Sequence, residues 1–178
     1  GTNHLPPQVR RFDYDSLSRL TLAVNAESGT ATYTYDANGN PREKRDARGI
    51  VTTYDHDALD RLRTITYTNE PPGSETPDVT NTYDDAAVPF SRGRLTRVHS
   101  SASIADVLAY DPLGRVTQSR QTTAGQAYGI HYGYDRAGHL ISQTYPSGRV
   151  VTTTFDRAER VDTVTSQPFQ GTVRPYAD

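Results

Sequence analysis

The chain has 178 residues, a formal net charge of −2 at pH 7 and only 34% hydrophobic residues. Acidic and basic residues are nearly matched and interleaved, which argues against a basic nucleic-acid-binding face. The absence of cysteine excludes disulfides and thiolate metal sites, and no apolar run approaches the roughly 18 residues of a membrane span.

A short motif recurs seven times along the chain, at intervals of 21 to 27 residues. Each copy has an aromatic residue, or once a histidine, followed by Asp, and most copies have an Arg-Leu-like pair five or six residues later. A repeat of this period indicates a small structural unit stacked on copies of itself. The candidate structural residues are Tyr14, Asp15, Tyr35, Asp36, His56, Asp57, Tyr83, Asp84, Tyr110, Asp111, Tyr134, Asp135, Phe155 and Asp156.

The segment before each motif has the alternation of a β-strand. Residues 1–11 precede the pattern and are expected to form an N-terminal extension, whereas residues 12–178 are expected to form a single array of about seven units. Tyr33 and Tyr35 flank Thr34, and the other copies repeat this arrangement. Because residues i and i+2 of a strand share a face, the pattern predicts an aromatic stripe on one side and a thin, tyrosine-rich core.

Turn signals separate the predicted strands. Residues 36–39 and 111–114 place Asp first and Gly last, as tight turns prefer, and a second glycine usually follows 14 to 17 residues after each motif. Each unit is therefore predicted to be strand, turn, strand, turn. Seven units give roughly 12 to 14 antiparallel strands, which twist should curl. Three prolines make residues 69–78 a protruding loop, and an insertion around residues 86–90 delays the fourth Arg-Leu pair to Arg94 and Leu95.

The repeated motif resembles the Rhs or YD-repeat family, which includes bacterial Rhs polymorphic toxins, the C components of Tc toxins, and teneurins. The resemblance covers about residues 12–166 and is clearest at residues 110–116 and 134–140. Ser18, Asp60 and Glu159 stand where the family usually has glycine, which leaves the conformation of these three turns open. The resemblance implies an all-β fold, in which antiparallel β-hairpin repeats form a curled ribbon or a section of a spiral β-shell.

Three features suggest chemistry but have simpler explanations. Residues 111–114 resemble the Asp-Pro-x-Gly element with which Rhs proteins cleave themselves, yet they lie inside a regular repeat and are interpreted as an ordinary turn. The five histidines lack paired ligand spacing, and the glycine of residues 36–40 comes too early for a calcium loop. We therefore predict no catalytic, cofactor-binding or metal-binding residues, and no enzyme activity.

Two functions of different classes remain, besides an enzyme that the repeat disfavours. The first, implied by the resemblance, is a wall segment of a bacterial shell that encloses a toxic C-terminal polypeptide, secreted or delivered extracellularly as part of a larger protein. The alternative is an adhesion module whose exposed tyrosines and Asp or Asn side chains bind glycans or a cell surface. The expected partners are neighbouring repeats or further copies at the sheet edges, the toxin cargo, and possible glycans, but neither nucleic acid nor a membrane span.

Overall fold

The computed structural model describes residues 9–167 of the chain. All regular secondary structure in this range is β-strand, and the range contains no helix that is long and apolar enough to cross a membrane. The strands are β1 (Arg11–Tyr14), β2 (Leu20–Asn25), β3 (Gly29–Tyr35), β4 (Pro41–Arg45), β5 (Val51–His56), β6 (Leu62–Thr68), β7 (Val79–Tyr83), β8 (Leu95–His99), β9 (Ser103–Tyr110), β10 (Val116–Thr123), β11 (Gln126–Tyr134), β12 (Leu140–Thr144), β13 (Val150–Phe155) and β14 (Val161–Gln167).

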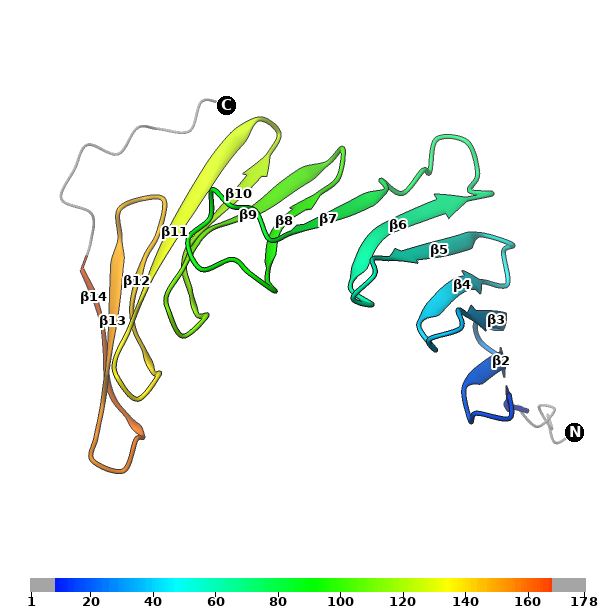
Figure 1. Ribbon diagram of the computed structural model, residues 1–178, viewed down its shortest axis with the longest axis horizontal. Coiled ribbons are helices and arrows are strands. Elements are labelled where there is room, and N and C mark those ends of the chain that lie inside the picture. Colours follow the sequence, from blue (N-terminus) through cyan, green and yellow to red (C-terminus); the bar gives the residue numbers. More distant parts are fainter. Residues whose placement is uncertain (1–8, 168–178) are drawn as a thin grey trace, which may run out of the picture. The chain divides into compact units, whose positions relative to one another are not determined.

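The fourteen strands form a sheet in which each is hydrogen-bonded to the strands before and after it in the chain (Figure 1). Each pair whose register is known is antiparallel, so successive strands form hairpins. The predicted all-β array of antiparallel hairpins is confirmed, and the number of strands agrees with the two strands expected per motif.

The chain divides into two compact units, residues 1–81 and 82–178. The first contains β1 to β6 and most of β7, and the second contains the end of β7 and β8 to β14. The boundaries expected from the sequence, an extension at residues 1–11 and one array at 12–178, stay predictions. Residues 1–8 and 168–178 of these segments lie outside the described residues, and Arg11 belongs to β1.

The sheet has a thin core, as predicted. In β3 half-buried and exposed residues alternate, with Tyr33 and Tyr35 among the half-buried ones. Among the described residues the buried hydrophobic side chains are Ala23, Ile50 and Tyr110, and no large side chain is fully buried. A single layer of strands leaves both faces partly open to solvent, so stability has to come from contacts between neighbouring hairpins.

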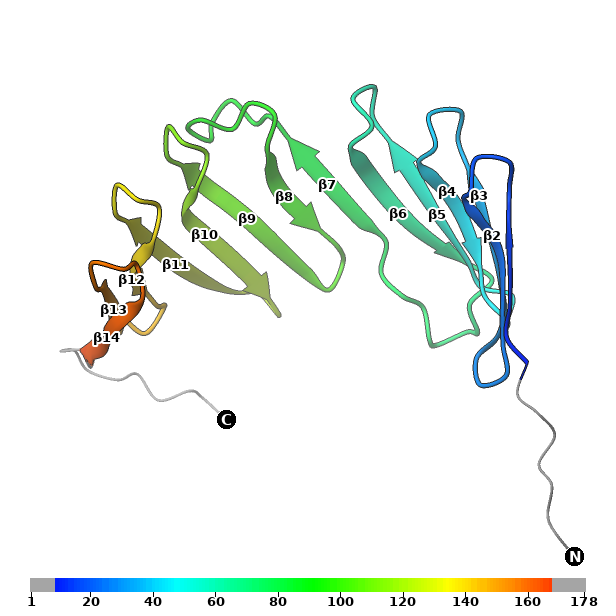
Figure 2. The same ribbon diagram turned by 90° about the horizontal axis from the view of Figure 1, so that it is seen from below.

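Within residues 1–81, and likewise within residues 82–178, the Tyr-Asp turns lie at one end of the strands and the other turns lie at the opposite end (Figure 2). Odd-numbered strands are followed by a Tyr-Asp motif or its equivalent, and even-numbered strands by the second turn, as at Gly29 and Gly125. In an antiparallel meander this order places all Tyr-Asp turns within either half of the chain at the same end of the strands. The predicted loop at residues 69–78 joins β6 to β7 and is largely exposed.

A β-bulge precedes most Tyr-Asp turns. Between β1 and β2, Asp13 lies opposite Leu22 but Tyr14 lies opposite Leu20, so Thr21 is the extra residue. The register shifts at the same place in the hairpins β3–β4, β5–β6, β9–β10, β11–β12 and β13–β14. A bulge increases local twist and redirects side chains, so the shift changes the direction of the motif residue beside it.

Candidate functional site: the Tyr-Asp corners

Six of the seven motifs open a compact five-residue turn, which we call a corner, and the fourth motif closes over a longer segment. At Asp15 the backbone N–H donates to the carbonyl of Arg19 at 3.0 Å, and the N–H of Ser18 donates back to the carbonyl of Asp15 at 3.0 Å. This is a tight turn followed by one residue in the left-handed region, a common hairpin connection. The same two backbone bonds occur at the corners that begin with Asp36, Asp57, Asp111, Asp135 and Asp156.

The fourth position of each corner has a positive φ angle. Glycine occupies it at Gly39, Gly114 and Gly138, with φ of 93°, 83° and 101°. The three corners left open by the sequence have the same conformation, because Ser18, Asp60 and Glu159 adopt φ of 59°, 59° and 60°. The turn is thus kept in these copies with a side chain in a region that costs a non-glycine residue of order 1 kcal/mol or more.

The corner aspartate holds the turn together with both carboxylate oxygens. At Asp57, Oδ1 accepts the N–H groups of Leu59 at 2.9 Å and Arg61 at 3.0 Å, and Oδ2 accepts Nε of Arg61 at 2.7 Å. Asp135 bonds the third and fourth following residues in place of the second and fourth. The same arrangement, with the fourth side chain on Oδ2, is present at Asp15, Asp36, Asp111 and Asp156.

These bonds hold the corner carboxylates in the ionised form. The side-chain hydrogen bond from Arg61, with the backbone donors and the Arg61 charge, lowers the pKa of Asp57 to about 2 against the opposing effect of burial. At Asp36 and Asp111 burial is the largest single influence and raises the pKa, but the several hydrogen bonds together outweigh it. A carboxylate that stays ionised at neutral pH suits a structural anchor and opposes a role as general acid.

The corner arginine and the next motif tyrosine join successive hairpins. The guanidinium carbon of Arg19 lies 4.7 Å from the ring centre of Tyr35, and the Tyr35 hydroxyl donates to the carbonyl of Leu20 at 2.9 Å. We call this pair of contacts a joint. It combines a cation–π contact with a hydrogen bond from the tyrosine hydroxyl to a backbone carbonyl.

Two further joints of this kind lie in residues 82–178. Arg115 lies 4.7 Å from the ring centre of Tyr134, whose hydroxyl donates to the carbonyl of Val116 at 3.0 Å. Arg94 lies 5.6 Å from the ring centre of Tyr110, whose hydroxyl donates to the carbonyl of Leu95 at 2.5 Å. The joint is therefore a repeated element, because one geometry recurs at three places along the chain.

Where the arginine is replaced, its partner is replaced as well. In residues 1–81, Asn40 and His56 take the places of arginine and tyrosine, and the side-chain amides of Asn38 and Asn40 each donate to Oδ1 of Asp60 at 2.8 Å. Asp60 is one of the non-glycine residues with positive φ, so its side chain provides a contact that glycine would lack.

The last described joint uses a different pair of rings. His139 stacks on Phe155 with ring centres 4.3 Å apart and an angle of 21° between the planes. Its Nδ1 also lies 2.8 Å from Oδ2 of Asp135. The imidazole thus keeps both contacts of the usual arginine, one with the corner carboxylate and one with the next aromatic ring.

The fourth corner keeps its closure despite the insertion. The N–H of Asp84 donates to the carbonyl of Arg94 at 3.1 Å, so the predicted delay of the Arg-Leu pair brings Arg94 to the usual place. Arg94 also donates to the carbonyl of Phe90 at 2.8 Å, and the carbonyl of Pro89 accepts the N–H of Tyr110 at 3.2 Å. The inserted residues are thereby tied to the joint that follows them.

Sequence reasoning missed the contacts of two aspartates outside the Tyr-Asp motifs, Asp46 and Asp106. Asp46 forms a corner at the opposite end of the strands, with Oδ1 accepting the N–H groups of Arg48 and Ile50 at 2.9 and 3.0 Å. Its signal was present in the Asp-x-x-Gly spacing of residues 46–49. Asp106 of β9, 5% exposed, pairs with Arg97 of β8 and Arg120 of β10 at 2.7 Å each, an arrangement that depends on strand register and has no local signal.

The features considered for catalysis or metal binding have structural surroundings. Asp111 makes the same bonds to Leu113 and Arg115 as the other corner aspartates make, which supports reading residues 111–114 as a turn. No group of three or more metal-ligating side chains comes together within residues 9–167. His4 lies outside the described residues.

Comparison with protein families identifies the type of repeat. A model described as RHS Repeat matches residues 35–70 and 134–172, which include the second, third, sixth and seventh motifs. The chain carries RHS repeats, as the resemblance of its motifs indicates. No curated protein matches the chain in sequence.

Solved structures share the fold of this RHS-repeat chain at low sequence identity. The crystal structure of TcdB2-TccC3-TEV is 14% identical, with a TM-score of 0.76 over 92% of this chain and 9% of that one. TcdB2-TccC3 itself is 13% identical, with a TM-score of 0.71 over 97% and 11%. A Photorhabdus luminescens Tc holotoxin pore with a TccC3 mutation is 13% identical, with a TM-score of 0.67 over 93% and 10%. The chain thus spans about a tenth of the length of these relatives.

Proposed function

We propose that this RHS-repeat chain is a segment of the wall of a larger Rhs-type shell, and that the shell encloses a toxic polypeptide cargo. In this proposal the fourteen strands have a structural role in the shell and no catalytic role. The parent protein is a bacterial toxin that is secreted or delivered outside the cell. The similarity to Tc toxin structures supports the fold on which the proposal depends.

The joint is the observation that carries the proposal. Three motif tyrosines, Tyr35, Tyr110 and Tyr134, are each completed by an arginine and a carbonyl of the preceding hairpin. A hairpin is therefore stable chiefly as a member of a series, which suits a continuous wall better than a solid globule. Such a wall also needs little core, in agreement with the few buried side chains among the described residues.

The terminal strands are suited to continuing the series. Every residue of β14 is exposed, including Val161 and Val164 at 58% and 63%. At the other end Tyr14 is 60% exposed and precedes the first described joint. We expect neighbouring repeats of the parent protein to pair with these strands, and isolated copies of the chain to associate through them.

Electron microscopy of the longer parent protein tests the proposal. We expect a hollow body with residues 11–167 in its wall, and a cargo that resists added protease until the wall is opened. The matched variants are Arg115→Ala, which removes a joint, and Arg63→Ala, which removes an exposed arginine on β6. Only the first should expose the cargo. A solid density, or a cargo cleaved equally in both variants and the unmodified parent, would contradict enclosure.

A further inference from the structure

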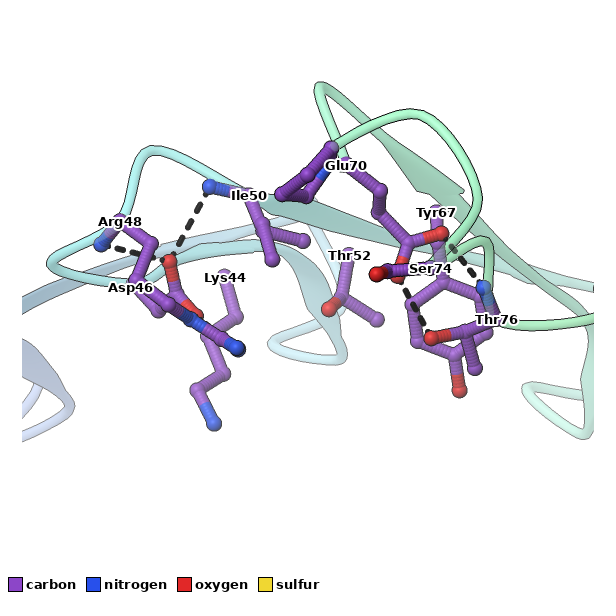
Figure 3. Close-up of a pocket in the computed structure, with 10 residues that line it drawn as sticks. Lys44, Asp46, Arg48, Ile50, Thr52, Tyr67, Glu70, Ser74 and Thr76 are labelled. Carbon is purple, nitrogen blue, oxygen red and sulfur yellow. Dashed lines mark hydrogen bonds and ion pairs between the residues drawn. The ribbon is translucent and has the colours of Figure 1, made fainter.

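Two departures from the repeat come together around one cavity in residues 1–81. The first is the Asp46 corner, and the second is the loop at residues 69–78. The cavity has a volume of about 320 Å³. Its lining residues are Lys44, Asp46, Arg48, Ile50, Thr52, Tyr67, Glu70, Pro71, Ser74 and Thr76 (Figure 3).

The loop forms a defined wall of this cavity. The carboxylate of Glu70 accepts both the N–H of Thr76, at 2.7 Å, and the Thr76 hydroxyl, which closes the loop across its base. The N–H of Ser74 donates to the carbonyl of Pro71 at 3.1 Å and shapes the tip. Three prolines and these internal bonds restrict the loop, so the wall is largely preformed.

A row of three side chains forms the floor. Lys44 on β4 lies opposite Thr52 on β5, and Thr52 lies opposite Tyr67 on β6. Residues that are directly opposite on neighbouring strands share a face and lie about 5 Å apart at Cβ. In Figure 3 Lys44 and Tyr67 extend to the same side of the strands, with Thr52 between them.

The charges around the cavity are used unequally. Asp46 accepts a hydrogen bond from Arg48 at 2.7 Å, and Glu70 accepts hydrogen bonds from Thr76, so both carboxylates already have partners among the residues that line the cavity. Lys44 is the single lysine of a chain with 19 basic residues, and no described residue forms an ion pair with it. A lysine is a compact charge on a flexible stem, whereas arginine is preferred in the fixed pairs seen elsewhere in this chain.

We propose that this cavity binds a sugar acid, a small hydroxylated ring that carries one carboxylate. The carboxylate pairs with Lys44, the ring hydroxyls bond to the hydroxyls of Thr52, Tyr67 and Ser74, and the apolar face of the ring packs against Tyr67. A volume near the lower limit of small-molecule sites, about 300 Å³, fits a single ring. The assignment does not depend on the enclosure of a cargo.

Binding to the purified chain tests the site with defined probes. We expect glucuronate to bind in calorimetry at low ionic strength, and to perturb the NMR signals of Lys44 and Tyr67. Glucose lacks the carboxylate and acetate lacks the hydroxylated ring, so the affinity for each should be lower than that for glucuronate by about tenfold or more. Inorganic phosphate serves as the probe for a site that selects charge alone.

The variants separate the site from general electrostatics. Lys44→Gln should weaken glucuronate binding about tenfold, whereas Arg63→Gln, which removes the same charge from an exposed β6 position, should leave it unchanged. Tyr67→Phe keeps the ring and should weaken binding about threefold. Circular dichroism establishes that each variant is folded.

Three results would overturn the assignment. These are glucuronate and phosphate binding with equal affinity, glucuronate binding that Lys44→Gln leaves intact, and signals of Lys44 and Tyr67 that do not respond to glucuronate. Lys44 offers a second readout because it is the only lysine. Acylation at Lys44, followed by peptide mass analysis, should slow in the presence of glucuronate but not of glucose.

Discussion

Tyr35 and Tyr14 occupy the same place in successive copies of the motif but have different surroundings. Tyr35 is half-buried, lies against the guanidinium of Arg19 and donates its hydroxyl to the carbonyl of Leu20. Tyr14 is 60% exposed, and no corner precedes it among the described residues. The difference shows that a motif tyrosine is half of a contact whose other half belongs to the preceding hairpin, so the stabilising unit spans two repeats.

The joints also differ in their chemistry. Arg115 and Tyr134 combine a permanent cation, an aromatic face and a hydroxyl bonded to a carbonyl. His139 and Phe155 retain the stacking and the contact with the corner carboxylate, but phenylalanine has no hydroxyl. The geometry of the corner is therefore kept while the number of polar contacts varies, which makes the joints suitable for matched substitutions.

The largest effect is expected from truncating a completed joint. Tyr110 is 9% exposed, lies beside Arg94 and bonds the carbonyl of Leu95. Tyr110→Ala should lower the free energy of unfolding by about 3–5 kcal/mol, because a large buried ring is lost and a cavity remains. Tyr14→Ala, at an exposed position, should lower it by about 0.5 kcal/mol or less. Urea unfolding measures both, and equal losses would contradict the division into complete and incomplete joints.

The sequence predicts the parts of this structure that are encoded within one repeat. Alternation around Thr34 predicts the β3 strand, and the Asp-x-x-Gly spacing at residues 36–39 predicts its corner. Contacts between repeats were not specified in this way. The Arg19 contact with Tyr35 depends on which residues the bulge brings together, and the Asp106 pairs depend on the register of three strands. The clamp between Glu70 and Thr76 lies in a loop that has no periodic pattern.

Acid should weaken the corners that contain arginine. The pKa of Asp57 is about 2 in the folded chain and about 3.9 for an unfolded aspartate, so its contribution is complete above about pH 4 and is lost as the pH falls toward 2. The melting temperature should therefore decrease as the pH is lowered from about 4 to about 2. Asp57→Asn should flatten that decrease more than Asp36→Asn, whose partner is Asn40 instead of arginine. An equal response of the two variants would show that the arginine adds nothing.

A smaller effect is expected from moving one hydroxyl between the two kinds of joint. Tyr134→Phe removes the bond to the carbonyl of Val116 and should lower the free energy of unfolding by about 1 kcal/mol. Phe155→Tyr adds a hydroxyl at the matching position, where the carbonyl of Leu140 is the equivalent acceptor, and should raise it by up to about 1 kcal/mol. Urea unfolding should give opposite signs. A loss in both variants would mean that the His139 joint excludes the tyrosine geometry.

The smallest effect concerns the corners that lack glycine. Glu159 has φ of 60° and an exposed side chain, so Glu159→Gly relieves left-handed strain of about 1–2 kcal/mol and adds about 0.5–1 kcal/mol of unfolded-chain entropy. The net gain should be about 0.5 kcal/mol. Asp60→Gly relieves the same strain but removes the carboxylate that binds Asn38 and Asn40, so it should give no gain. If thermal unfolding ranks Asp60→Gly as the more stable variant, the amide contacts of Asn38 and Asn40 contribute nothing to stability.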